Sequence, residues 1–209
     1  MPETRARLLA EAEVLLRTKG YAAFSYADLA ERIAIRKASI HHHFPAKEAL
    51  LTALVDEYLA KFIATLADLA VTRVDARDRL RAYSRLFLEG MERGLLPLCG
   101  ALSAERAALP DAMRPVIARF FQLHVDWLVE QIDDGIASGV LRPDVDAFET
   151  AHLLLGALEG GSFVAWALED NAPVLSAFET AMHNIETTGP VVSQRTTPAS
   201  RRPSPRRST

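Results

Sequence analysis

The sequence predicts an all-α protein of two helical domains. Three observations support this fold class. Apolar residues recur at helical spacing along most of residues 4–186, helix start and stop signals separate the segments, and no stretch alternates with the two-residue period of a β-strand. With 209 residues, 49% of them hydrophobic and 24% charged, the chain is long enough to bury a sizeable core.

The first predicted helix extends from about Thr4 to Thr18. Gly20 follows it, at a place where a left-handed C-terminal cap favours glycine. The apolar face of this helix is formed by Leu8, Leu9, Ala12, Leu15 and Leu16.

Two short helices are predicted next, over residues 25–33 and 35–44. Ser25 is expected to open the first by accepting a hydrogen bond from the N–H of Asp28, whose carboxylate reaches back. Pro45 ends the second, because the residue before a proline avoids helical angles. Two short helices joined by a tight turn are typical of a helix-turn-helix, whose second helix enters the major groove of DNA.

The second short helix carries the residue types that this role requires. Ala38 and Ser39 keep its outer surface thin, while Arg36 and Lys37 offer charge-assisted hydrogen bonds to phosphates or guanine. We therefore expect Lys37, Ala38 and Ser39 to read bases, and Arg36 to contact either a base or the backbone.

Three consecutive histidines, His41, His42 and His43, raise the alternative of a metal site. Neighbouring residues on a helix point about 100° apart, so these side chains cannot converge on one ion. No metal and no other cofactor is therefore expected.

In this region the chain resembles the TetR (tetracycline-repressor) family of transcriptional regulators. The family pattern has a leading basic helix, then Gly-Tyr, and later the run Val-Ser-Lys-Gly-x-Leu-Tyr-x-His-Phe-x-x-Lys-Glu. Here the matching segments are Gly20-Tyr21 and residues 35–48, which read IRKASIHHHFPAKE. Arg36 replaces the usual serine, Ala38 the glycine and His41 the tyrosine, so the operator sequence cannot be predicted.

The resemblance implies a homodimer that binds a palindromic double-stranded operator and is released by a small-molecule effector of unknown identity. It also implies phosphate contacts by Lys47, phosphate or base contacts by His41 and His42, and either a mixed or a mainly structural role for His43. The expected DNA-contacting residues are Ser25, Tyr26, Arg36, Lys37, Ala38, Ser39, His41, His42, His43 and Lys47.

A long helix is predicted after Lys47, reaching about Leu69, and is expected to link the two domains mechanically. Polar residues 73–78 break the pattern. We expect a DNA-binding domain over residues 1–47, completed by the linking helix to about residue 62. A ligand-binding and dimerisation domain should follow over residues 48–186, and a basic tail over residues 187–209.

Residues 80–94, a short segment after Pro97, and residues 111–139, 146–169 and 173–186 are predicted to be helical. The resemblance implies that such helices enclose a ligand cavity, although aromatic residues on them are equally compatible with an ordinary core. The candidate ligand contacts are Tyr83, Phe87, Phe120, His124, Trp127, Phe163 and Trp166.

Three glycines, Gly156, Gly160 and Gly161, interrupt the penultimate helix. Each costs about 1 kcal/mol relative to alanine, which calls for a packing reason. The resemblance implies that Gly156 and Gly160 lie in a four-helix dimer interface; bending of the helix near the ligand pocket is the alternative.

Charge is distributed unevenly along the chain. Residues 1–47 carry eight Lys or Arg against five acidic residues, residues 48–186 carry eleven against twenty-two, and residues 187–209 carry five Arg and no acid. A basic N-terminal segment followed by an acidic segment favours one orientation of the protein on a polyanion. The Pro-, Ser- and Arg-rich tail is expected to be disordered, either as a passive tail or as a nonspecific DNA arm.

The single cysteine, Cys99, excludes an internal disulfide and suits a reducing cytoplasm. It is expected to pack as a small apolar residue, with redox sensing as the alternative. No window approaches the apolar run of a membrane helix or signal peptide, so we expect a cytoplasmic protein without a membrane partner.

No catalytic motif is evident, so an enzyme is not expected. Two other classes remain as alternatives: a helical small-molecule-binding protein with only nonspecific DNA affinity, and an enzyme that uses Cys99 with a histidine.

Overall fold

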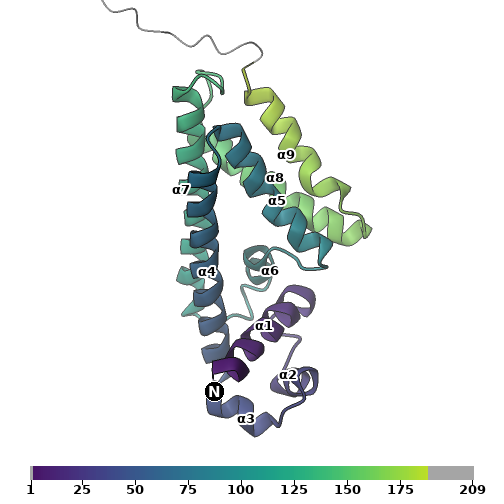
Figure 1. Ribbon diagram of the computed structural model, residues 1–209. Helices are drawn as coiled ribbons and strands as arrows, with labels where there is room; N and C mark the ends of the chain where they lie inside the picture. Colours follow the sequence, from purple (N-terminus) through teal and green to yellow (C-terminus); the bar gives the residue numbers. More distant parts are fainter. Residues whose placement is uncertain (1, 188–209) are drawn as a thin grey trace, which may run out of the picture.

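The computed structural model describes residues 2–187, which fold into helices joined by short connections (Figure 1). The all-α prediction is confirmed, since the described residues contain no strand beyond an isolated bridge between Leu141 and Glu186. The predicted tail lies outside the described residues from position 188 onward. The helices are α1 (Pro2–Lys19), α2 (Tyr26–Ile33), α3 (Lys37–His43), α4 (Lys47–Thr72), α5 (Ala76–Glu92), α6 (Leu98–Ala104), α7 (Met113–Ala137), α8 (Ala147–Leu168) and α9 (Ala172–Ile185).

Helices α1, α2 and α3 pack with the first half of α4 around one hydrophobic core, which we call the head. Its central side chains are fully buried and include Leu8, Leu16, Leu29, Ile40 and Leu50. Leu98 and Leu102 of α6 and Met113 of α7 belong to the same core. The head is therefore joined by packing, as well as by the α4 backbone, to the helices that follow it.

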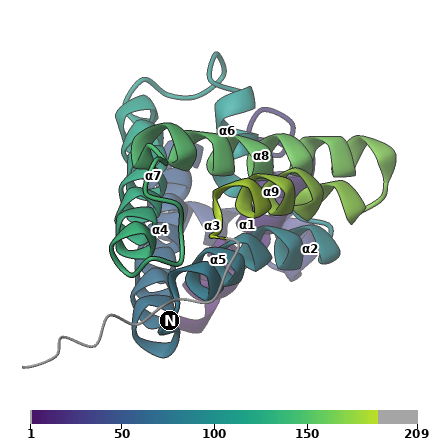
Figure 2. The ribbon, with the colours of Figure 1, turned by 90° about the horizontal axis from the view of Figure 1, so that it is seen from above.

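The second core, which we call the body, lies among α5, α7, α8, α9 and the second half of α4. Long helices α4 and α7 run side by side, and α8 and α9 pack along each other on the other side of the molecule (Figures 1 and 2). Between the head and the body sits the short helix α6 (Figure 1).

The capping box predicted at Ser25 is present at the start of α2. The Ser25 hydroxyl accepts hydrogen bonds from the N–H groups of Ala27 and Asp28, and the Asp28 carboxylate accepts one from the Ser25 N–H at 2.8 Å. The Ser25 hydroxyl also donates a hydrogen bond to the Asp28 carboxylate at 2.7 Å, and this bond, followed by that from the Ser25 N–H, lowers the pKa of Asp28. At the other end Ala34 takes a left-handed conformation (φ 56°), which makes the turn into α3.

Helix α8 departs from the expectation that no segment is as apolar as a membrane span. By length and composition alone it is long and apolar enough to cross a membrane, with a mean hydropathy of 1.3 over an 18-residue window, one third of which is buried. Core helices of soluble proteins meet the same criterion. In this fold α8 packs against α7 and α9 on one side and leaves an apolar face exposed on the other.

Candidate functional site

The outer surface of α3 lies at the far end of the head, away from the body (Figure 1). Ile40 is fully buried in the head core and anchors the helix. The neighbouring side chains consequently face outward, and the exposed ones are Lys37, Ala38, Ser39, His41 and His42.

Arg36 occupies the N-cap position of α3, where its side chain makes no capping hydrogen bond. Its backbone is extended (φ −74°, ψ 141°) and the residue is exposed. The basic side chains of Arg36 and Lys37 therefore stand together at the start of the exposed surface, as the helix-turn-helix hypothesis requires.

The polar groups of Tyr26 and Ser25 form hydrogen bonds with other residues of the head, those of Tyr26 in its interior and those of Ser25 at its surface. The buried Tyr26 hydroxyl donates a hydrogen bond to the Phe44 carbonyl at 2.9 Å, and burial raises the pKa of Tyr26 to about 12. Its ring contacts His41 edge-on, with centroids 5.0 Å apart. The Ser25 hydroxyl is committed to the α2 cap. Both residues thus support the position of α2 and α3, and their predicted DNA contacts stay predictions.

The histidine run has three different surroundings. Nδ1 of His41 lies 3.2 Å from the Pro45 carbonyl oxygen, His42 is exposed, and His43 is half-buried. The rings of His42 and His43 are perpendicular, with centroids 5.6 Å apart. Among residues 2–187, no group of three or more His, Cys, Asp or Glu is placed to hold a metal ion.

Lys47 is committed to the connection between α1 and α2. Its ammonium donates hydrogen bonds to the carbonyls of Tyr21 and Phe24 and lies over both rings, 4.4 and 4.2 Å from their centroids. Partial burial lowers the pKa of Lys47. The resemblance implies a phosphate contact by Lys47, which stays a prediction; in the structure this amine has two carbonyl partners within the head.

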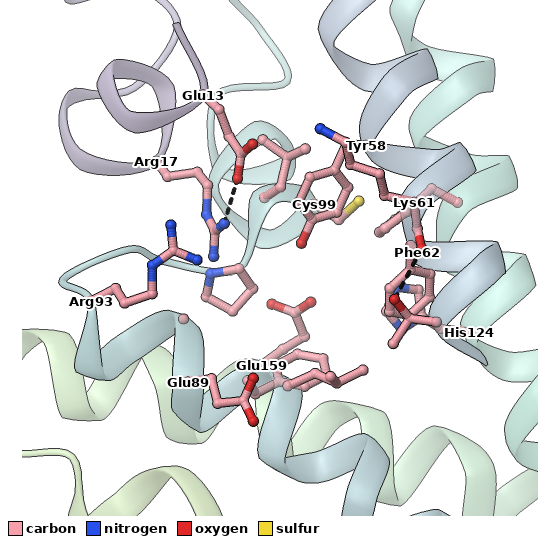
Figure 3. Close-up of a pocket in the computed structure, with 17 residues that line it drawn as sticks. Glu13, Arg17, Tyr58, Lys61, Phe62, Glu89, Arg93, Cys99, His124 and Glu159 are labelled. Atoms are coloured by element: carbon pink, nitrogen blue, oxygen red, sulfur yellow. Dashed lines mark hydrogen bonds and ion pairs between the residues drawn. The ribbon is translucent and has the colours of Figure 1, made fainter. Parts of the chain in front are cut away.

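A cavity of about 400 Å³ lies between the head and the body (Figure 3). Side chains from α1, α4, α5, α7 and α8, together with α6 and the segment before it, line the cavity. Its aromatic walls are formed by Tyr58, Phe62, Phe87 and Phe120.

Three of the predicted ligand contacts, Phe87, Phe120 and His124, line this cavity. Tyr83 lies directly behind, fully buried, with its hydroxyl 2.5 Å from Nδ1 of His124. Trp127 stacks on Tyr83 and borders a second, more open groove between α4 and α7.

Phe163 and Trp166, the other two predicted ligand contacts, line neither hollow. Both lie on α8 and are more than one-third exposed. The Phe163 ring nevertheless lies close to the Glu159 carboxylate, because a Cβ at Gly100 would meet Phe163 Cε2 at 3.2 Å and Glu159 Oε2 at 2.3 Å.

The structure adds Arg17, Tyr58 and Glu159 to the cavity, none of which the sequence analysis selected. Glu159 carried a usable signal, because it is one of few charged residues in the apolar segment of α8. Arg17 and Tyr58 carried none, since both lie on regular amphipathic helices outside the predicted pocket-forming segments.

Arg17 ties α1 to the wall of the cavity. Its guanidinium pairs with Glu13 at 2.7 Å and donates hydrogen bonds to the carbonyls of Leu96 at 2.6 Å and Leu95 at 3.4 Å. Arg17 is 7% exposed. A Cβ at Gly90 would lie 2.8 Å from the Arg17 Nη2, so the glycine leaves room for this side chain.

Two polar atoms in the cavity lining are buried and have no hydrogen-bond partner among the described residues: Nε2 of His124 and Oε2 of Glu159. Burial lowers the pKa of His124 to about 3, so its ring is neutral. The buried Tyr83 hydroxyl must donate its proton and has Nδ1 of His124 as its partner, which assigns the imidazole proton to Nε2. Burial also raises the pKa of Glu159 to about 7.

Cys99 lines the cavity and is 3% exposed. Burial, and then the nearby carboxylate of Glu159, raise the pKa of its thiol well above the usual value. A protonated, buried thiol is a weak nucleophile, which agrees with an apolar packing role rather than with redox sensing.

The exposed face of α8 is apolar and contains two of the three glycines. A Cβ on Gly156 or Gly160 would meet nothing within 4 Å, whereas one on Gly161 would meet the Pro173 carbonyl oxygen of the α8–α9 connection at 2.8 Å. Gly161 thus serves packing inside the subunit, and the other two leave an open surface. Large exposed apolar side chains on the same helix are Phe148, Leu153, Phe163, Val164, Trp166 and Leu168.

Comparison with known proteins gives a consistent result for both parts of the chain. Residues 8–54 match the family model for bacterial regulatory proteins of the tetR family, and residues 76–181 match that for a tetracyclin repressor-like C-terminal domain. A TetR-family transcriptional regulator from Agrobacterium tumefaciens has a similar structure, with a TM-score of 0.85 and 30% identity, over 90% of this chain and 100% of that chain.

Two repressors are also similar to this chain. The reduced form of NemR from Escherichia coli has a TM-score of 0.77 and 25% identity over 90% of this chain and 98% of that chain. The transcriptional repressor DhaR of Mycobacterium sp. (strain GP1) is 25% identical over 85% of this chain and 89% of its own length.

Proposed function

Because this chain belongs to the TetR family of bacterial regulatory proteins, we propose that it is a cytoplasmic, homodimeric repressor released from its operator by a small molecule. Proteins of this family are transcriptional regulators and not enzymes, and its similar relatives include the HTH-type repressors DhaR and NemR. One observation carries the proposal: the head that exposes α3 shares its core with α6, which also borders the cavity.

The exposed surface of α3 is the proposed base-reading element. Arg36 and Lys37 supply donors for guanine or phosphate, and Ala38 and Ser39 allow close approach to base edges. In a dimer, the two copies of α3 would need to lie about 34–36 Å apart to enter successive major grooves of a palindrome.

Ligand binding would act on this spacing through contacts between the cavity and α1. Arg17 connects α1 with the segment before α6, and Glu105 at the end of α6 accepts a hydrogen bond from the Ala22 N–H at 2.7 Å. A ligand that favours another position of α6 would shift the head through both contacts. The ligand would then lower the population of the arrangement that binds the operator, to an extent set by how much more tightly it binds the other arrangement.

Replacing Lys47 by methionine tests whether this residue holds the head together or contacts phosphate. We expect a loss of about 2–3 kcal/mol in the free energy of unfolding, because two charge-assisted hydrogen bonds and two cation–π contacts disappear. The measurement is urea unfolding together with the salt dependence of operator binding. If Lys47 is structural, the slope of log affinity against log salt concentration stays unchanged in the variant. A slope reduced by about one per subunit, with an unchanged free energy of unfolding, would instead support a phosphate contact.

The apolar face of α8 that surrounds Gly156 and Gly160 is the proposed dimer interface, formed with α9 as a four-helix arrangement. Replacing Gly160 by leucine should shift the protein toward monomer, because a Cβ there meets no atom of its own subunit within 4 Å and the larger side chain would obstruct the partner. Sedimentation measures the change. Ala118→Leu, which adds the same side chain at an exposed position of α7, is the control. A Gly160→Leu protein that stays dimeric contradicts the interface.

Mobility shift against the intergenic DNA upstream of the gene tests the function as a whole. Binding that survives competitor DNA, with a salt slope set by a limited number of phosphate contacts, supports a sequence-specific regulator. A steep salt slope without sequence preference would instead identify a small-molecule-binding protein with nonspecific DNA affinity.

A further inference from the structure

We propose that the cavity binds an organic cation, an amine or quaternary ammonium with a small apolar body, whose charge pairs with Glu159. This inference rests on the proposed function, in which the cation would be the effector, and adds the chemical class of that effector.

The carboxylate of Glu159 is aimed into the cavity. In Figure 3 it projects from α8 toward the middle of the lining residues, below Cys99. Its Oε2 is buried and accepts no hydrogen bond from the described residues. A Cβ at Gly100 would lie 2.3 Å from this oxygen, so the glycine on α6 makes space for the carboxylate. An acceptor in such a place is unfavourable until a ligand supplies a donor or a positive charge.

Of the three basic residues that line the cavity, Arg17 and Lys61 are paired, and Arg93 is exposed to solvent. Arg17 pairs with Glu13 and donates to two backbone carbonyls, and Lys61 pairs with a carboxylate on its own helix. His124 is neutral because burial lowers its pKa to about 3. The one charge in the interior of the cavity that the protein leaves unmet is therefore negative, at Glu159.

The walls suit the rest of such a ligand. Tyr58, Phe62, Phe87 and Phe120 line the same cavity, and aromatic faces attract cations and pack apolar groups. A volume of about 400 Å³ admits a small molecule rather than a long chain.

A carboxylate ligand fits this cavity less well. The one buried cation of the lining is Arg17, and a carboxylate ligand would have to take it from Glu13 and from the carbonyls of Leu95 and Leu96, leaving those acceptors without donors. The other basic residues of the lining, Lys61 and Arg93, are exposed, where an ion pair contributes little. The ligand would also face Glu159 directly, where like charges repel.

The test compares a probe cation with its neutral isostere, benzyltrimethylammonium with neopentylbenzene, by calorimetry on the full-length protein without DNA. We expect the cation to bind at least about tenfold more tightly, and Glu159→Gln to abolish this preference. Glu89→Gln is the matched control, because Glu89 is a carboxylate of the same lining but exposed. It should keep the preference.

The pH dependence provides a second measurement that needs no variant. Benzyltrimethylammonium does not titrate, so its affinity should follow the ionised fraction of Glu159 and rise about tenfold from pH 6 to pH 8. Burial raises the pKa of Tyr58 to about 12, raises those of Tyr83 and Cys99, and lowers that of His124 to about 3, so none of them ionises in this range. The other charged groups that line the cavity are Arg17 and Glu13, which pair with each other, Lys61, which pairs with Glu57, and the exposed Glu89 and Arg93.

Three results would overturn the inference: equal binding of the neutral isostere, undiminished cation binding by Glu159→Gln, or tighter binding of phenylacetate than of the cation. Operator-binding measurements distinguish failure of the proposed function from failure of the proposed ligand class. Glu159-dependent cation binding that leaves operator affinity unchanged supports the ligand class and contradicts ligand-released repression. Release of the operator by another compound, without cation binding, overturns the ligand class and leaves the regulator.

Discussion

Replacing Lys37 by glutamate is expected to lower the affinity of the dimer for its operator by about 100-fold or more. Lys37 is exposed at the first position of α3, and each base or phosphate contact of this kind contributes about 1–3 kcal/mol. The dimer loses two such contacts and gains two carboxylates facing phosphate. An acidic residue in the first turn also suits the helix dipole, so the fold should be retained.

Competition mobility shift at fixed salt measures this loss, with circular dichroism to verify folding. Arg85→Glu makes the same change in charge at an exposed position of α5, outside the head. It should change operator affinity only slightly. Equal losses in the two variants would mean that net charge, and not the surface of α3, governs binding.

Replacing Arg17 by methionine is expected to lower the free energy of unfolding by about 3 kcal/mol. The change leaves the partly buried Glu13 carboxylate and the carbonyls of Leu95 and Leu96 without their donors, and breaking a buried pair from one side is costly. Because these bonds also join α1 to the cavity wall, operator binding in the variant should respond less to the effector.

Arg32→Met is the matched control for Arg17→Met. Arg32 also pairs with a glutamate of α1, Glu11, at 2.8 Å, but both side chains are more than one-third exposed. Its loss should cost less than about 1 kcal/mol. Urea unfolding measures the free energy of unfolding of both variants. Equal decreases would mean that Arg17 stabilises the fold no more than a surface ion pair does.

Sequence patterns determined the fold class, the capping box at Ser25 and the membership of the TetR family. Each depends on residues close together in the chain, where helical spacing, caps and a short turn leave few alternatives. The outward face of α3 is predictable for the same reason, since Ile40 must be buried and its neighbours on the helix must then face outward.

What only the tertiary structure decided is how distant side chains meet. Lys47 binds carbonyls more than twenty residues earlier, and Arg17 reaches carbonyls 78 and 79 residues later. In the sequence, Glu159 is an isolated charge in an apolar helix. Only the structure shows that α6 and Gly100 lie beside its carboxylate. Periodicity specifies which face of a helix is buried but not which residue it will meet, and the chemistry of the cavity follows from those meetings.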